Sequence, residues 1–173
     1  MTDADAAATA GWRHREVVRP EWVDYNGHMN VAFYVLVFDH ATDAALDHLM
    51  LGEDYRRQTG CSVFVGEMHV TYRQEVLAGD ELTVATRLLA SDDRRLVLFH
   101  EMSCPRFAVP VAGNEVLCVH VDLATRRAAP WPAVAIETLA WVLASQARLP
   151  PPKQAGRSIR LVSRSSPRAH RHP

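Results

Sequence analysis

The segment that most constrains the fold is Val31–Phe38, a run of consecutive apolar residues. It opens a predicted helix over residues 31–51, with Asn26 or Asn30 as N-cap and Gly52 just past the end. A helix that is apolar on every side must be enclosed. In a chain of 173 residues, a curved sheet can enclose it, or a sheet together with a partner subunit.

Segments of alternating apolar and polar residues predict this sheet. The expected strands cover residues 14–19, 62–74, 81–89, 95–102 and 115–123. Short turns at 78–80 and 91–93 suggest that consecutive strands form an antiparallel meander. Within residues 62–74, the alternation places Phe64 on the same face as Met68. A second helix is expected over residues 133–147.

The order of one strand, a long helix and four strands is that of the hotdog fold. We therefore expect an α+β protein with a single hotdog domain, in which an antiparallel sheet wraps around a long central helix. The expected boundaries are a flexible N-terminus at 1–12, the domain at 13–150, and a basic, partly disordered tail at 151–173. Because hotdog subunits usually pair edge to edge, we expect a homodimer or a tetramer.

Charge and cysteine content exclude several classes of protein. The segment from Lys153 onward carries six basic and no acidic residues, which leaves 13 basic against 20 acidic groups in residues 1–152. This net charge of −7 argues against a nucleic-acid partner. Cys61, Cys104 and Cys118 form no CxxC pair, so a reduced, cytoplasmic protein is expected. Neither a signal peptide nor a membrane helix is expected.

The helix is preceded by a dense polar turn, Asp24-Tyr25-Asn26-Gly27-His28-Met29-Asn30. On residue types alone, a capping Asp and a common Asn-Gly turn explain much of it. However, the turn holds more hydrogen-bonding groups than capping requires, and it adjoins a buried helix. Polar groups at a helix N-terminus can also stabilise a developing negative charge.

The turn resembles known thioesterases. Asp24-Tyr25-Asn26-Gly27 falls where 4-hydroxybenzoyl-CoA-type thioesterases carry a turn with a catalytic Asp. The pattern Asp24-x-Asn26-x-His28-x-Asn30 is similar to a stretch of plant-type acyl-carrier-protein thioesterases. The resemblance implies that Asp24, Asn26 and His28 are catalytic. Tyr72-Arg73-Gln74-Glu75 also resembles a segment of those enzymes and implies a site role for Glu75.

A wider string, residues 20–30 followed by 38–43, resembles betainyl-CoA thioesterases of carnitine breakdown. Their substrate carries a quaternary ammonium group, so this resemblance implies an aromatic or acidic pocket for a cation. The candidate substrate-binding residues are Trp22, Tyr25, Asn30, Phe64, Glu67 and Glu75. Core packing remains an alternative for each aromatic ring, and a solvent-facing position remains one for Glu67 and Glu75.

The implied reaction is hydrolysis of an acyl-CoA thioester, with Asp24 as general base or nucleophile. His28 can orient Asp24, hold the water or protonate the leaving thiolate. Backbone N–H groups at the helix start can form an oxyanion hole. No cofactor is expected, because CoA is part of the substrate. No metal is expected either, since His69, His100 and His120 lack metal-ligand spacing.

Two other functions stay open. Hotdog enoyl-thioester hydratases carry a similar string, but with the His five residues after the Asp, whereas His28 lies four after Asp24. A non-catalytic acyl-CoA sensor would not need Asp24 and His28. The sequence also leaves open the acyl group, the carrier (CoA or acyl-carrier protein), dimer against tetramer, and the role of the basic tail.

Overall fold

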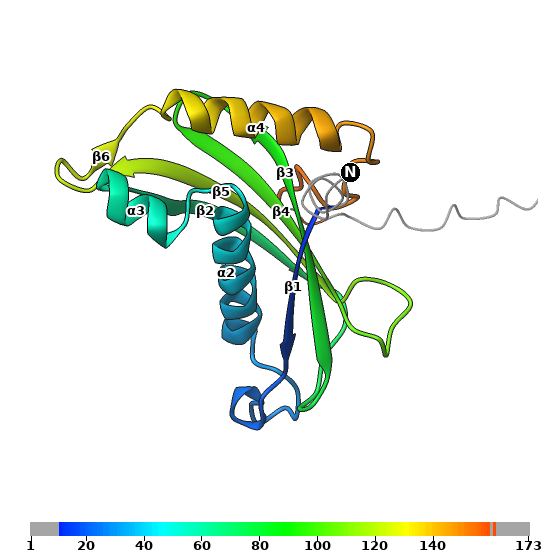
Figure 1. Cartoon of the computed structure of the whole chain (residues 1–173). Coiled ribbons are helices and arrows are strands. Elements are labelled where there is room, and N and C mark those ends of the chain that lie inside the picture. The colour runs from blue at the N-terminus through cyan, green and yellow to red at the C-terminus, as the bar shows by residue number, and fades with distance from the viewer. Residues whose placement is uncertain (1–10, 160, 162–173) are drawn as a thin grey trace, which may run out of the picture.

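A computed structural model describes residues 11–159 and 161 of the chain. It contains one antiparallel sheet with the long helix α2 (Val31–His48) lying across one face (Figure 1). The strands are β1 (Trp12–Val17), β2 (Cys61–Tyr72), β3 (Glu81–Ser91), β4 (Arg95–Ser103), β5 (Ala112–Asp122) and the short β6 (Arg127–Ala128). This arrangement confirms the predicted α+β hotdog fold. The predicted flexible N-terminus and basic tail fall largely on residues 1–10, 160 and 162–173, outside the described part.

The strand order is β1-β3-β4-β5-β2, with β6 beside β5. Strands β3 to β5 form the predicted meander, but β2 is not a neighbour of β3. It pairs with β5 instead, with Tyr72 opposite Ala112. The expectation of consecutive neighbours fails here because residues 73–80 form a crossover rather than a tight turn. In this crossover, Val76 is buried and its carbonyl accepts a hydrogen bond from the Met29 N–H (2.9 Å).

Helix α2 is enclosed along one side only. Val37, Phe38, Ala41 and Ala45 are almost fully buried, whereas Val31 remains 58% exposed. The apolar first turn is therefore incompletely covered by the chain's own sheet.

The predicted long helix ends earlier than expected. Its C-cap is Leu49, and Met50 has a φ of 60°, in the left-handed region. A separate helix α3 (Glu53–Thr59) follows, with Gly52 as its N-cap. The polar sequence of α3 shows no apolar periodicity, which is why it was not predicted. Its Tyr55 hydroxyl lies 2.8 Å from His120 Nε2 on β5.

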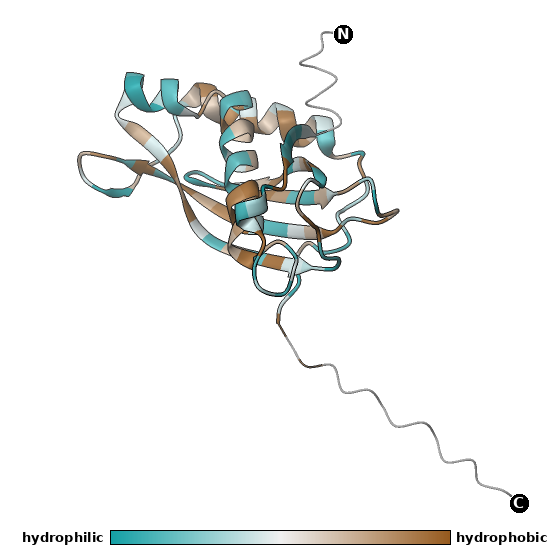
Figure 2. Ribbon diagram, turned by 90° about the horizontal axis from the view of Figure 1, so that it is seen from below, coloured by the Kyte–Doolittle hydropathy of each residue, from teal (hydrophilic) through white to brown (hydrophobic). Residues whose placement is uncertain are grey.

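Two apolar cores lie along the sheet. One gathers residues around Phe38, Met29 and Met102 near the start of α2. The other lies between the C-terminal half of α2 and helix α4 (Ala133–Gln146), which confirms the predicted second helix. Brown apolar segments alternate with teal polar ones along the strands (Figure 2), as strands with one buried face require.

Strand β2 contains an irregularity at Gly66, where the pairing with β5 shifts between Val65 and Glu67. Such a bulge exchanges the faces of the residues on either side of it. Met68 packs against the core, whereas Phe64 is 38% exposed. The predicted common face for Phe64 and Met68 is therefore wrong, because simple alternation cannot anticipate a bulge.

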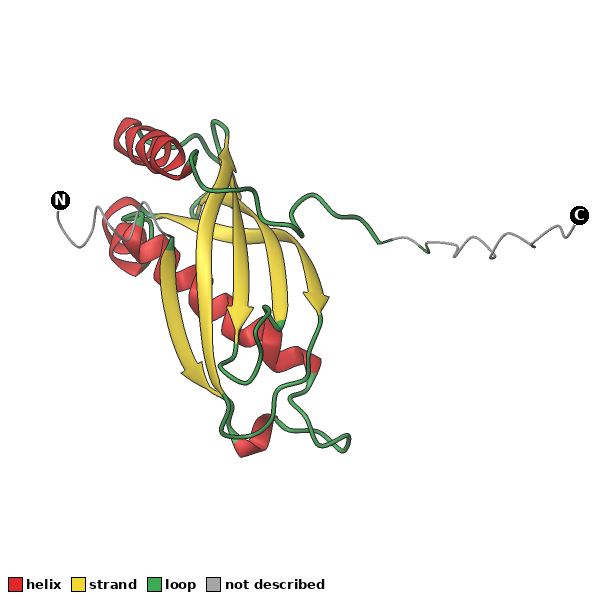
Figure 3. Ribbon diagram, turned by 90° about the vertical axis from the view of Figure 1, so that its right-hand side faces the viewer, coloured by secondary structure: helices red, strands yellow, loops and turns green. Residues whose placement is uncertain are grey.

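The segment after α4 crosses the face of the sheet opposite α2 (Figure 3). Arg87 Nη1 donates to the Pro150 carbonyl (2.9 Å), and the Gly156 N–H donates to the Glu115 carboxylate (2.6 Å). Between them, Gln154 is only 4% exposed. Contacts with the domain thus continue past the expected boundary at residue 150.

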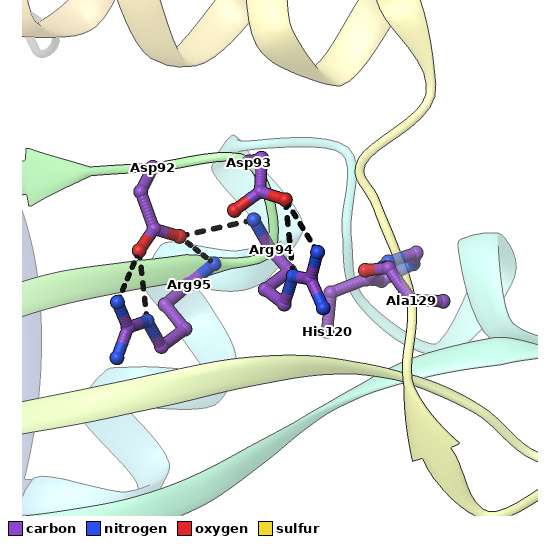
Figure 4. A network of polar contacts seen from close by, with 6 residues as sticks. All are labelled: Asp92, Asp93, Arg94, Arg95, His120 and Ala129. Atoms are coloured by element: carbon purple, nitrogen blue, oxygen red, sulfur yellow. Dashed lines mark hydrogen bonds and ion pairs between the residues drawn. The ribbon is translucent and has the colours of Figure 1, made fainter.

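The turn between β3 and β4 was predicted correctly, and acidic side chains fix it (Figure 4). Asp92 accepts hydrogen bonds from the Arg94 N–H (3.0 Å) and the Arg95 N–H (2.7 Å). The backbone hydrogen bond from Arg94, together with the Arg95 side chain, lowers the pKa of Asp92 to about 2. Nearby, His120 Nδ1 lies 2.8 Å from the Ala129 carbonyl and ties β5 to the segment before α4.

All three cysteines are free thiols. Cys104 and Cys118 are buried, and burial raises the pKa of the Cys118 thiol to about 12. Within the described residues, the helices are too short or too polar to cross a bilayer. A cytoplasmic location stays a prediction.

A buried histidine lies between α2 and the sheet. His100 Nε2 lies 3.0 Å from Thr42 Oγ1, and its Nδ1 lies 2.8 Å from Thr86 Oγ1. Thr42 Oγ1 donates to the Phe38 carbonyl, so it accepts from His100. Burial lowers the pKa of His100 to about 3.

We expect His100 to make folding sensitive to mild acid. An unfolded histidine has a pKa of about 6.5, so the unfolded chain binds a proton below that pH that the folded chain does not. Above pH 6.5 His100 is neutral in both states and causes no loss of stability. Between pH 6.5 and the pKa of His100 in the folded chain, the free energy of unfolding falls by about 1.4 kcal/mol per pH unit. His100→Gln should unfold in urea with a shallower dependence on pH between 6.5 and 4.5. Equal slopes for variant and wild type would contradict this.

Candidate active site

The polar turn folds as a tight hairpin. Val23 and Met29 form an antiparallel bridge, and the Gly27 N–H donates to the Asp24 carbonyl (2.9 Å). The Asp24 N–H in turn donates to the His28 carbonyl (3.1 Å). Gly27 has a φ of 83°, a conformation that explains the glycine of the Asn-Gly pair. The hairpin presents Asp24 and His28 at the start of α2.

Asn30 connects this hairpin to the helix. Its Oδ1 accepts a hydrogen bond from the Ala32 N–H (3.0 Å), so Asn30 rather than Asn26 is the N-cap of α2. Its Nδ2 donates to Asp24 Oδ2 (3.2 Å), while Asp24 Oδ1 accepts from the Asn26 N–H (2.8 Å). The carboxylate is therefore held by two donors near the positive end of the helix dipole.

A pocket of about 260 Å³ opens beside the hairpin. Its walls come from the hairpin, the first turn of α2, the end of β2 and the start of the crossover. The lining residues are His28, Met29, Val31, Tyr34, Tyr72, Arg73, Gln74 and Glu75. The Tyr34 hydroxyl donates to the Gln74 carbonyl (3.2 Å), which joins the helix to the crossover.

The structure brings only some of the predicted residues to this pocket. His28 and Glu75 line it, and Asp24 and Asn30 lie in the adjoining hairpin. Asn26 contacts Asp24 through its backbone. Trp22 is buried and stacks on Phe33, with ring centroids 5.3 Å apart, so it serves the core. Tyr25 is 96% exposed at the tip of the hairpin.

Phe64 and Glu67 also lie elsewhere. They precede Tyr72 by eight and five positions on β2. At about 3.3 Å per residue, this is roughly 26 and 16 Å from the pocket wall of the same subunit. The guanidinium carbon of Arg126 lies over the ring of Phe64, 5.3 Å from the ring centroid. The expected cation pocket of Trp22, Tyr25, Phe64 and Glu67 is thus not assembled within one chain.

Two pocket residues were not anticipated as a pair. Tyr34 and Tyr72 meet edge to face, with ring centroids 5.2 Å apart and planes at 83°. Burial raises the pKa of Tyr34, and the neighbouring Tyr72 and Glu75 add to the effect. Tyr72 belongs to the segment that suggested Glu75, but Tyr34 was hidden because an aromatic residue in an apolar helix looks like core.

A separate polar cluster joins β1 to α2. Glu16 Oε2 lies 3.2 Å from His14 Nε2 and 3.0 Å from His40 Nδ1. Burial opposes ionisation of Glu16, but hydrogen bonds from His40 and His14 outweigh it and lower its pKa. Among the residues that the structure describes, these three side chains have possible metal-ligand atoms close enough together to share one ion. The cluster does not include His69, His100 or His120, and none of its members lines the pocket.

Comparison with known proteins gives consistent matches. A family model described as "Thioesterase-like superfamily" matches residues 18–142. A Pseudomonas aeruginosa protein named betainyl-CoA thioesterase is 38% identical over 144 residues, which cover 83% of this chain and 91% of that protein. An Agrobacterium fabrum L-carnitine dehydrogenase/betainyl-CoA thioesterase is 41% identical over 86% of this chain, which spans only 30% of that longer protein. A Staphylococcus aureus protein solved in complex with CoA has a TM-score of 0.80 at 27% identity, covering 87% of this chain and 94% of its own.

Asn30 offers a test of the hairpin geometry. Asn30→Ala removes both the helix cap and the hydrogen bond to Asp24, so we expect a loss of about 1 kcal/mol in the free energy of unfolding. Asn30→Asp keeps an acceptor for the Ala32 N–H but places a second carboxylate beside Asp24. We expect both variants to lose turnover, and only Asn30→Ala to lose substantial stability in urea unfolding. Full turnover in Asn30→Asp would show that the contact with Asp24 is dispensable.

Proposed function

Because the chain belongs to the thioesterase-like superfamily and is a thioester hydrolase, we propose that it hydrolyses betainyl-CoA to betaine and CoA through the carboxylate of Asp24. The observation that carries the proposal is the placement of Asp24, fixed by Asn26 and Asn30 at the start of α2 beside the pocket. The names of the relatives support the betainyl group.

Two routes use the same carboxylate. As a general base, Asp24 takes a proton from water, and the resulting hydroxide bonds to the acyl carbon. As a nucleophile, an Asp24 oxygen bonds to the acyl carbon itself, and water later cleaves the anhydride. In both routes the carbon–sulfur bond breaks and the CoA thiolate takes up a proton. Each oxygen has one hydrogen-bond donor from the chain, so lone pairs remain for either role.

The other groups of the hairpin complete the proposal. His28 Nδ1 lies 3.3 Å from the Met29 carbonyl, which can only accept, so Nδ1 donates. In the neutral ring Nε2 then carries no proton and is left to accept a hydrogen bond from the water. The N–H groups of Ala32 and Phe33 already donate hydrogen bonds to the side-chain oxygen and the carbonyl of Asn30. We therefore assign the helix-start donor of the oxyanion hole to the N–H of Val31, a residue that lines the pocket.

We also propose that two copies pair along β2. In the described chain β2 has one neighbour, β5, so its other edge is unpaired. An unpaired edge is a ready template for another strand. Phe64 and Val65 are exposed on this strand, and Val31 is exposed at the start of α2. A homodimer would cover these groups and complete the wall of the pocket.

Asp24→Asn should lose at least about 100-fold in turnover while folding normally, since it loses a general base or nucleophile. The measurement is thiol release from betainyl-, acetyl-, 4-hydroxybenzoyl- and long-chain acyl-CoA, with Asp39→Asn, an exposed residue of α2, as the matched control. Release that survives in Asp24→Asn would remove Asp24 from the mechanism.

If none of the thioesters releases thiol, the hydrolase proposal fails. Hydrolysis in oxygen-18 water then separates the two routes in the active enzyme. Label incorporated into Asp24 during a single turnover indicates the nucleophile, and its absence indicates the base.

Light scattering should give twice the mass of the chain for the wild type. Val65→Lys places a charge on the proposed interface and should shift the protein toward monomer at micromolar concentration. Val17→Lys, the same change at an exposed valine of the opposite edge strand β1, should leave the mass unchanged. A monomeric wild type, or equal effects of both variants, would refute pairing along β2.

A further inference from the structure

The pocket beside Asp24 has an aromatic corner built from two tyrosines. Tyr34 is buried, and its hydroxyl is fixed by the Gln74 carbonyl. Tyr72 meets it edge to face, yet remains 46% exposed. Core packing accounts for Tyr34, but it does not account for a large ring left half open at a pocket wall.

Two carboxylates lie near this corner. Glu75 lines the same pocket, three residues after Tyr72. Its carboxylate lies close enough to Tyr34 to help raise the pKa of the phenol, as does that of Asp80. Asp80 is already paired with Arg106, whose Nε lies 3.3 Å from its Oδ2. Glu75 is therefore the acidic group of this corner that can serve a ligand.

Two arginines lie near this corner. Arg106, the partner of Asp80, also donates from Nη2 to the backbone carbonyl of Glu75 (3.2 Å). Arg73 also lines the pocket, but its guanidinium contacts Gln154 in the segment on the opposite face of the sheet. With the amide nitrogen of Gln154 toward Thr71, its oxygen accepts from Arg73 Nε (2.6 Å) and Nη2 (3.0 Å). In this orientation of the amide, the Arg73 guanidinium is engaged with Gln154.

We propose that Tyr34, Tyr72 and Glu75 form the subsite for a quaternary ammonium group at the end of the acyl chain. This rests on the proposed function, because the same pocket must also hold the thioester. Aromatic faces attract such cations, and a methylated nitrogen has no N–H to satisfy, so rings and a carboxylate suffice to bind it. The open side of Tyr72 supplies the ring face, and buried Tyr34 holds that ring in place.

The test compares betainyl-CoA with 3,3-dimethylbutyryl-CoA, in which carbon replaces the nitrogen and the shape is kept. The readout is the ratio of the two kcat/KM values, which cancels effects on the chemistry that both substrates share. We expect the kcat/KM of the wild type to be at least about 10-fold higher for betainyl-CoA. A factor of this size corresponds to the attraction between a cation and one aromatic ring with one carboxylate. Glu75→Gln and Tyr72→Leu should each lower this ratio several-fold.

Matched variants separate recognition from structure. Tyr72→Phe keeps the ring face and should keep most of the ratio. Glu101→Gln and Trp141→Leu, an exposed acid and a half-exposed ring outside the pocket, should not change it. Losses that are equal for both substrates in Tyr72→Leu and Glu75→Gln would show a purely structural role and overturn the subsite.

Failure of the subsite and failure of the function give different results. If both thioesters are hydrolysed and the wild type does not discriminate between them, the subsite is refuted while the hydrolase stands. If neither thioester releases thiol, the proposed function itself is wrong, and the subsite falls with it. Circular dichroism melting curves of each variant identify any loss that comes from unfolding.

Discussion

Burial of one side of α2 against the curled sheet is the constraint on which the rest of the structure depends. Phe38 and its neighbours fix the helix axis across the strands, and this sets where its N-terminus lies. The polar hairpin, the end of β2 and the crossover then meet at that point, joined by the contacts of Met29 with Val76 and of Tyr34 with Gln74. The pocket is a consequence of that meeting, since no single element contains it.

Asn30 shows how closely folding and chemistry are connected at this end of the helix. One amide group caps α2 with its oxygen and holds Asp24 with its nitrogen. The cap gives the side chain a fixed orientation, so the carboxylate is positioned by a group that is itself immobile. In this way a side chain in a turn acquires the precision of regular secondary structure.

Much of the fold followed from periodicity, because the apolar helix, the alternating strands and their turns leave strong local patterns. The position of β2 did not, because pairing with β5 depends on a crossover whose buried residue, Val76, gives no local signal. The bulge at Gly66 likewise gives no local signal in the sequence, and it places Phe64 on the face opposite to the one expected. At the candidate site, the dense polar motif pointed to Asp24, His28 and Asn30, which lie at or beside the pocket. The two tyrosines of the pocket could be paired only from the three-dimensional structure. Tyr34 and Tyr72 lie on different elements, and only Tyr72 belongs to a segment that the sequence singled out.

The contact of Gln154 with Arg73 has a consequence for the wall of the pocket. The amide that holds the guanidinium lies in a segment that crosses the face of the sheet opposite α2 (Figure 3), while the pocket is lined in part by Val31 and Tyr34 of α2. The arginine at the pocket wall is therefore anchored from the other side of the sheet. A change at Gln154 would release the Arg73 guanidinium, while the hairpin that carries Asp24 would keep its own hydrogen bonds.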